Sequence, residues 1–188
     1  QAVTFKGASA MFDGKTITDG NGAAATNLLL TNTVTANLSK AAVDNIQFSA
    51  ANTGTATLTL ANNANLDFQA AQHATNAITL SQVAANKGVS TDVVNILASD
   101  CATLVITSDS TAAATETAFN TVNFNSGTKT AVTSLIATLG TGTLNIAGSK
   151  GVTLDATSTA GKVDATNLTG ALTATADKAT TAVITGGS

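Results

Sequence analysis

The sequence contains no proline, tryptophan, tyrosine or arginine, and its 188 residues include one cysteine and one histidine. A disulfide-stapled domain needs paired cysteines, so that class is excluded. A nucleic-acid-binding surface needs a stripe of basic side chains, and eight scattered lysines without arginine do not form one. Charged residues make up only 10% of the chain, against the ~25% that is usual in globular proteins.

Long apolar runs are also absent. A membrane-spanning helix requires about 18 consecutive apolar residues, and the apolar runs of this chain are much shorter, so we expect no insertion into a membrane. A disordered chain combines low hydrophobicity with high charge, whereas 44% of these residues are hydrophobic. The composition therefore predicts a folded chain.

Threonine and alanine are abundant instead, with 36 and 37 residues. Most apolar clusters alternate with Thr, Asn or Ser, and a period of two places alternate side chains on opposite faces of a strand. Threonine suits such strands because its β-branch favours an extended backbone. The clusters include Val3–Phe5, Ile46–Phe48, Leu58–Leu60, Leu66–Phe68, Ile78–Leu80, Asn95–Leu97, Leu104–Ile106, Val122–Phe124, Leu144–Ile146, Val152–Leu154 and Val183–Ile184.

Equal spacing between clusters is the most informative feature. Phe48 and Phe68 are twenty residues apart, and so are Leu60 and Leu80. Self-similarity on this scale is typical of repeat folds, in which each coil buries its inward side chains against the next coil. We therefore predict an all-β fold, a parallel β-helix (β-solenoid), with a narrow aliphatic core and with Thr and Asn pointing outward or forming ladders at the corners. An antiparallel β-sandwich also has many short alternating strands, and it is the alternative.

A nine-residue repeat appears near the end of the sequence. Leu154-Asp-Ala-Thr157 recurs as Val163-Asp-Ala-Thr166 and as Leu172-Thr-Ala-Thr175. Two such units make eighteen residues, close to the longer period, so we expect coils of ~18–20 residues. Turns are expected at Asn62-Asn63, Ser126-Gly127, Gly140-Thr-Gly142 and Gly148-Ser149, because Asn, Gly and Ser tolerate turn geometry.

The period is irregular between about residues 85 and 140. We expect loop insertions near 81–92 and 109–120, each with room for a short alanine-rich helix, at Ser81–Lys87 and Thr111–Ala118. The chain begins and stops within strand patterns, so we interpret residues 1–188 as a single solenoid segment of a larger protein. A mature, processed chain is the alternative.

These features together resemble a known group of proteins. The Thr/Asn/Ala alternation, the nine-residue period and the sequence Ile184-Thr-Gly-Gly-Ser188 are similar to β-rich regions of Gram-negative surface proteins exported by type I secretion, such as surface-layer (S-layer) proteins and repeats-in-toxin (RTX) adhesins. The resemblance implies an extracellular location at the cell surface, secretion without a cleaved signal, calcium-dependent folding and a structural or adhesive role. It also implies contact with identical copies and with outer-membrane polysaccharide. The G-G-x-G-x-D calcium motif is incomplete in this sequence.

Two aspartates are the candidate calcium ligands. Asp155 and Asp164 occupy equivalent positions of two nine-residue units, and half a coil apart they would lie on different faces. Calcium prefers six to eight oxygen ligands, and Asp, Asn, Thr and carbonyl oxygens are of the right type. We predict a calcium site at Asp155 or Asp164, with solvated positions on the outer face as the alternative. The loop Phe12–Gly22 also carries Asp13, Asp19 and Asn21, but it lacks EF-hand spacing, and we expect ordinary turns there.

Catalytic groups are scarce. His73 has no neighbouring ligand or partner in sequence, and we expect it in a turn. Cys101 lacks the adjacent base that a nucleophilic thiol needs, so we expect a small buried side chain. Glu116 is the only glutamate, and the ten aspartates are dispersed.

Three functions follow from these observations. The first is a structural, self-assembling cell-surface protein, a subunit segment of a surface-layer lattice or filament, without catalysis. The alternative is a stalk or binding module of a type I-secreted adhesin, with the irregular stretches as binding loops. A polysaccharide lyase or hydrolase is disfavoured, because it needs clustered charged side chains on one face and the chain has no arginine.

Overall fold

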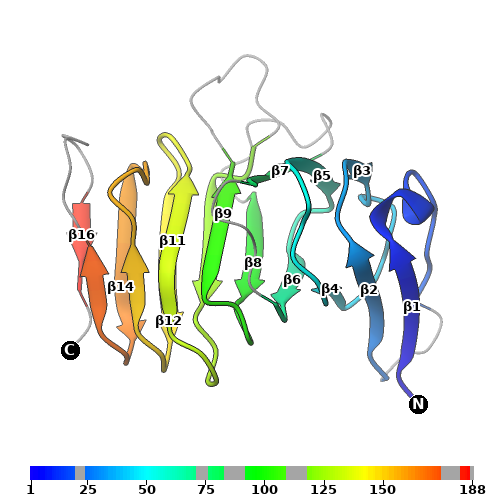
Figure 1. The fold of residues 1–188 in the computed structure, drawn as a ribbon. Helices are drawn as coiled ribbons and strands as arrows, with labels where there is room; N and C mark the ends of the chain where they lie inside the picture. Colours follow the sequence, from blue (N-terminus) through cyan, green and yellow to red (C-terminus); the bar gives the residue numbers. More distant parts are fainter. Residues whose placement is uncertain (20–23, 71–75, 83–91, 109–117, 175–182, 187–188) are drawn as a thin grey trace.

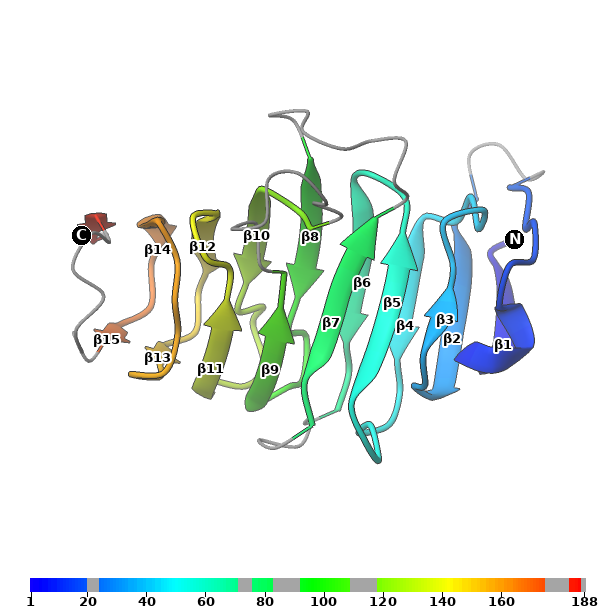
Figure 2. The ribbon, with the colours of Figure 1, turned by 90° about the horizontal axis from the view of Figure 1, so that it is seen from above.

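The computed structural model describes residues 1–19, 24–70, 76–82, 92–108, 118–174 and 183–186. Within these residues, sixteen strands and one short 3-10 helix, η1 (Ser9–Phe12), are present. After β1 and β2, which pair directly, successive strands pass back and forth between two sheets, so that each coil stacks on the preceding one (Figures 1 and 2). Every strand pairing in the two sheets is parallel. The fold is therefore a β-solenoid, as predicted, and not a sandwich of hairpins.

Both sheets run along the whole solenoid. The nine-stranded sheet contains, in spatial order, β1 (Val3–Ala8), β2 (Thr26–Asn32), β4 (Asn45–Phe48), β6 (Ala64–Phe68), β8 (Val93–Leu97), β10 (Thr121–Asn125), β12 (Thr143–Gly148), β14 (Lys162–Leu168) and β16 (Val183–Thr185). The seven-stranded sheet contains β15 (Leu172–Ala174), β13 (Val152–Leu154), β11 (Val132–Thr138), β9 (Thr103–Thr107), β7 (Ile78–Gln82), β5 (Ala56–Leu60) and β3 (Ala36–Asn37).

Coil length is regular except in the middle of the chain. Ile46 pairs with Leu66, twenty residues later, and Asn27 pairs with Asn45, eighteen residues later. By contrast, Ala64 pairs with Val94, thirty residues later. The longer coils include the segments between β7 and β8 and between β9 and β10, where insertions were expected. Ser81 and Gln82 were expected to start a helix but belong to β7, and residues 83–91 and 109–117 lie outside the described residues.

The register of the strand pairs confirms one predicted spacing between clusters and changes two others. Phe48 does pair with Phe68. Leu80, however, pairs with Leu58 rather than with Leu60, so that coil has twenty-two residues. In the nine-residue repeat, Leu172 likewise pairs with Val152 and not with Leu154, which makes a coil of twenty. Each correction is a shift of two residues, and a shift of two keeps the same side chains inward because the strand period is two.

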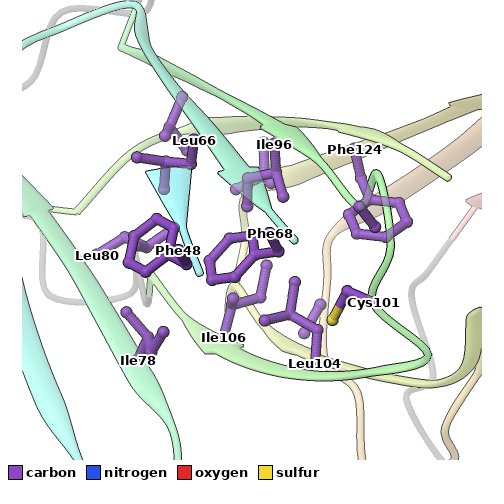
Figure 3. Packing of buried hydrophobic residues seen from close by; sticks show 14 of the residues in the cluster. Phe48, Leu66, Phe68, Ile78, Leu80, Ile96, Cys101, Leu104, Ile106 and Phe124 are labelled. Carbon is purple, nitrogen blue, oxygen red and sulfur yellow. The ribbon is translucent and has the colours of Figure 1, made fainter. Parts of the chain in front are cut away.

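The core is a narrow layer between the two sheets. Large fully buried side chains include Phe48, Phe68 and Phe124, and Figure 3 shows aliphatic residues from both sheets meeting around them. Phe48 and Phe68 stack in adjacent coils, with ring centroids 4.3 Å apart and an interplanar angle of 10°. The next residue of this column is Ala98, which follows β8 and is fully buried. Large side chains in some coils and small ones in others therefore fill the same narrow space.

The expected turn residues occupy the corners of the coils. Asn63, Gly127 and Gly140 have positive φ angles of 61°, 65° and 57°. Such angles suit glycine and asparagine much better than other residues. These turns confirm the sequence prediction at Asn62-Asn63, Ser126-Gly127 and Gly140-Thr-Gly142.

Candidate functional site: an amide-lined groove on the nine-stranded sheet

A row of six asparagines crosses the outer face of the nine-stranded sheet. Parallel pairing places them in one register, one per coil, at Asn27, Asn45, Asn65, Asn95, Asn123 and Asn145. Strand spacing in a parallel sheet separates successive members by roughly 4.8 Å. The next position in this row is Asp164 of β14. We call this row the asparagine ladder.

Side-chain hydrogen bonds connect the ladder in one direction. The amide Nδ2 of Asn145 donates to Oδ1 of Asn123 at 2.8 Å, Asn123 donates to Asn95 at 2.9 Å, and Asn95 donates to Asn65 at 3.1 Å. Asn65 instead donates to the backbone oxygen of Asp44 at 2.9 Å. The ladder then resumes with a 3.0 Å bond from Asn45 to Asn27. Such aligned amide chains polarise one another and hold the side chains in a single rotamer.

A second row lies beside the ladder and forms the rest of a groove. Gln47, Asp67, Leu97, Asn125 and Ala147 occupy this row in consecutive coils. Together the two rows line a groove of about 920 Å³ that extends over β4, β6, β8, β10, β12 and β14. Leu97 is 37% exposed, and it is the only one of the exposed large apolar residues in the described part of the chain that lines this groove. The groove therefore has a polar lining with one apolar patch near its centre.

The charge of the groove is negative but sparse. Its charged lining residues are Asp67 and Asp164, and no lysine lines it. Oδ2 of Asp67 accepts a hydrogen bond from Gln69 Nε2 at 2.8 Å, whereas its Oδ1 is shielded from water and has no hydrogen-bond partner. The two carboxylates belong to strands that are four positions apart in the sheet, which is roughly 19 Å at parallel strand spacing. The pair of acids in an inverting glycosidase is only ~6.5–9.5 Å apart, so these two carboxylates cannot form that pair.

Sequence reasoning expected outward asparagines and ladders at the corners, and it missed the ladder on the sheet face. A signal was available, because each ladder asparagine directly precedes an inward apolar residue, as in Asn65-Leu66, Asn95-Ile96 and Asn123-Phe124. The irregular coil lengths hid the common register of these dipeptides.

Asp155 and Asp164, the predicted calcium ligands, both accept hydrogen bonds from a threonine two residues later. Oδ1 of Asp155 accepts hydrogen bonds from the backbone nitrogen and the hydroxyl of Thr157, both at 2.9 Å. Oδ1 of Asp164 accepts the equivalent bonds from Thr166, at 3.2 and 2.7 Å. In both units the aspartate oxygen therefore accepts bonds from the threonine two residues later, at a turn after β13 for Asp155 and within β14 for Asp164. As expected, the two residues lie on different faces, since Asp155 follows β13 and Asp164 lies in β14 of the other sheet.

These hydrogen bonds stabilise the charged carboxylates. The backbone amide of Thr157, and then its hydroxyl, lower the pKa of Asp155 below its ordinary value. For Asp164, the Thr166 hydroxyl and the Lys162 ammonium lower the pKa from 3.8 to about 2. The Lys162 Nζ lies 3.0 Å from Asp164 Oδ2, a position that a calcium ion would have to take over.

A calcium site at Asp155 or Asp164 would need further oxygen ligands close to these carboxylates. Calcium needs several oxygen ligands converging on one point, and the described ranges hold no group of three or more acidic, histidine or cysteine side chains that could bind a metal. Threonine and lysine already occupy both oxygens of Asp164. The surroundings of Asp155 and Asp164 do not fit a multi-ligand calcium site, and calcium binding there stays a prediction.

The other sequence candidates have simpler surroundings. Cys101 is fully buried in the core cluster, and its thiol donates to the backbone oxygen of Thr103 at 3.2 Å, as expected for a small buried side chain. Asp13 accepts a hydrogen bond from the backbone nitrogen of Asn37 at 2.7 Å, and Asp19 accepts one from the Thr26 hydroxyl at 2.8 Å. These bonds hold the loop before β2 onto the solenoid. His73, Glu116 and Asn21 lie outside the described residues.

One buried carboxylate was not expected from the sequence. Asp92, directly before β8, is 1% exposed, and among the described residues neither of its carboxylate oxygens has a hydrogen-bond partner. Its backbone oxygen accepts a hydrogen bond from Thr121 at 3.0 Å, so the residue sits in register within the coil stack. A buried carboxylate without a partner is costly to the folded state. A single aspartate between Thr91 and Val93 carries no sequence signal for such a position.

Comparison of the chain with protein-family models, with curated proteins and with solved structures found no match. Among the described residues, no helix has the length and apolar character that crossing a membrane would require.

Proposed function

We propose that this chain is a structural, self-assembling element of a cell-surface protein, acting as a segment of a surface-layer lattice or filament subunit. The observation that carries this proposal is the apolar character of both outermost strands of the coil stack. Phe5 of β1 is 39% exposed, whereas Leu28 in the same column of β2 is fully buried. Ile184 of β16 is 45% exposed, and its partner Val163 in β14 is buried.

The outer edges of β1 and β16 are suited to continue the stack. An edge strand displays backbone N–H and C=O groups that can pair with a further strand. Both strands belong to the nine-stranded sheet, at its opposite ends, and a parallel strand added to either edge would cover exposed side chains of the inward columns. A head-to-tail contact between identical copies is a heterologous contact and propagates into a filament. Further coils of the same polypeptide would cover these edges in the same way.

The low charge of the chain supports association between identical copies. Its net charge is −3 over 188 residues, so electrostatic repulsion between neighbours is weak. We place the protein in the extracellular space, at the cell surface, on the resemblance to type I-secreted surface proteins. Calcium dependence of the assembly belongs to the same proposal.

The decisive experiment measures self-association of edge variants. Sedimentation velocity over a concentration series, with and without calcium, should detect large assemblies, which negative-stain microscopy should resolve as filaments or sheets. Phe5→Lys and Ile184→Lys should reduce assembly strongly, because each places a charge on one apolar edge. Leu97→Lys, on the face of the middle coil, is the matched control and should assemble normally. A protein that stays monomeric at high concentration, or edge variants that assemble like the control, would refute the proposal.

A second function, a binding module of an adhesin, is favoured by a different observation. The amide-lined groove offers ordered hydrogen-bonding groups on a rigid sheet face, as expected for a recognition surface. The expected binding loops near 81–92 and 109–120 fall largely outside the described residues. Binding of the intact chain to host or sugar surfaces, and its loss in Leu97→Lys, would favour this function over assembly alone.

A further inference from the structure

We infer that the amide-lined groove binds a neutral, extended polysaccharide chain that lies along the solenoid axis. The inference deepens the binding-module alternative and does not depend on self-assembly. It commits to one ligand class, a hydroxyl-rich linear polymer without charge.

The shape of the groove favours a linear ligand. The lining continues across six neighbouring strands of one sheet. At parallel strand spacing, the first and last of these strands are roughly 24 Å apart. A single small molecule would fill only part of this length, whereas an extended chain would contact the same kind of side chain in every coil.

The chemistry of the ladder favours hydroxyl groups. A primary amide has two N–H donors and an oxygen with two lone pairs. The bonds that Asn123 makes to Asn95 and receives from Asn145 use one donor and one lone pair. Each such amide retains one donor and one acceptor, and a sugar hydroxyl can serve both. The ladder bonds hold these groups in place before binding, which lowers the entropic cost of ordering them.

The second row adds complementary features. Gln47 lines the groove in the same row as Asp67 and brings a further amide, while Leu97 and Ala147 provide apolar surface for the C–H face of a sugar ring. Asp67 contributes an oxygen that lacks a donor, and a sugar hydroxyl reached by a small rotation of this side chain would supply one. These groups lie beside the ladder, so one ligand chain can touch both rows.

Charge and composition exclude the other polymers. Asp67, a carboxylate of the lining, would repel an acidic polysaccharide or a nucleic acid, whereas Asp164 is paired with the Lys162 ammonium at 3.0 Å. A peptide strand would need a free sheet edge, and the strands under the groove are paired on both sides. A strong protein or sugar hot spot would favour Trp, Tyr and Arg, which this sequence lacks, so we expect weak binding at a single groove. Neutral glycan is the class that remains, with modest affinity at one groove and higher avidity in an assembly of many copies.

The side-chain amides themselves provide the assay. In ¹H–¹⁵N correlation spectra, titration with cellohexaose, a neutral extended glycan, should shift the NH2 signals of Asn95, Asn123 and Asn145. An oligogalacturonate of equal length, which is acidic, should leave them unchanged, and so should calcium alone.

Paired variants locate the site. Leu97→Lys places a long charged side chain in the centre of the groove and should weaken cellohexaose binding roughly tenfold or more. The matched control is Thr79→Lys, in β7 on the outer face of the seven-stranded sheet, and it should bind normally. Thermal unfolding of both variants, measured by circular dichroism, verifies that each is folded. If Leu97→Lys does not fold, Gln47→Ala provides the same test with a smaller truncation.

Three results would overturn the inference: no amide shifts with cellohexaose at millimolar concentration, equal shifts with the acidic oligomer or with calcium, or equal binding by Leu97→Lys and Thr79→Lys. Leu97→Lys should lose cellohexaose binding but still self-assemble. Unchanged glycan binding by this variant would contradict the glycan inference alone, and a lack of assembly by the unmodified chain would contradict the assembly proposal alone.

Discussion

Phe68→Ala tests whether stacking between coils holds the centre of the solenoid together. Phe68 is fully buried and stacks on Phe48 of the preceding coil at 4.3 Å. Truncation of a buried phenylalanine to alanine costs about 3–5 kcal/mol of unfolding free energy, from lost burial and the remaining cavity. The conservative variant Phe68→Leu retains most of the volume and should cost less than about 1.5 kcal/mol.

The partner ring allows the stacking contribution to be separated. In a double-mutant cycle of Phe48→Ala and Phe68→Ala, the coupling energy should be about 0.5–1.5 kcal/mol, as for other stacked aromatic pairs. Phe124 is buried in the same sheet, two strands beyond β6. Phe124→Ala should show weaker coupling to Phe48→Ala, because these two rings belong to coils that are not adjacent.

Two assays are suited to this chain. It has no tryptophan or tyrosine, so urea unfolding should be followed by far-ultraviolet circular dichroism. The one cysteine, Cys101, is fully buried next to the affected coil, where the Asp100 nitrogen donates to the Phe68 oxygen at 3.2 Å. Its labelling rate by a thiol reagent therefore reports local opening, and a loss of 3 kcal/mol should accelerate labelling roughly a hundredfold. If Phe68→Ala lies within about 1 kcal/mol of Phe68→Leu in both assays, the packing argument is wrong.

Three further predictions test the corners and the carboxylates. A Cβ at Gly170 would lie against the backbone of Lys150, so Gly170→Ala should lower the urea midpoint. A Cβ at Gly54 would meet nothing within 4 Å, so Gly54→Ala should leave the urea midpoint unchanged or stabilise the chain by up to about 1 kcal/mol. The pKa of Asp164 is lowered from 3.8 to about 2, so the stabilising contribution of this carboxylate should be complete above pH 4 and should disappear as the pH falls through 2. Carbon-detected NMR titration measures the pKa, and a midpoint near 4 would contradict the hydrogen bonds from Thr166 and Lys162. Asp92→Asn removes a buried carboxyl group that has no hydrogen-bond partner among the described residues and should stabilise the chain by about 1–3 kcal/mol in the presence of a chelator; destabilisation in thermal unfolding would mean that the carboxyl group has a partner.

The common row of the ladder asparagines was not predicted from the sequence. Each ladder asparagine looks like an ordinary outward polar residue of a short strand, and the apolar residue that follows it does not by itself show which asparagines share a row. The groove exists because Asn65 and Asn95, thirty residues apart, occupy adjacent positions in the sheet. A fixed period of eighteen to twenty residues would have placed them in different rows. Similarly, the strand around Leu28-Leu29-Leu30 was not recognised, because three consecutive leucines conceal the alternation that the structure shows, with Leu29 facing outward.

The sequence by itself indicated most of the strands and their inward faces and favoured a stack of coils, because alternation with period two and recurring clusters are properties of the chain that survive small changes in turn length. Only the tertiary structure decided the register, since each insertion changes the coil length without changing the pattern inside the strands. The asparagine ladder, the stacked Phe48–Phe68 pair and the buried position of Asp92 all depend on that register. They are properties of residues brought together from different coils, and contacts between coils cannot be read from the spacing within one.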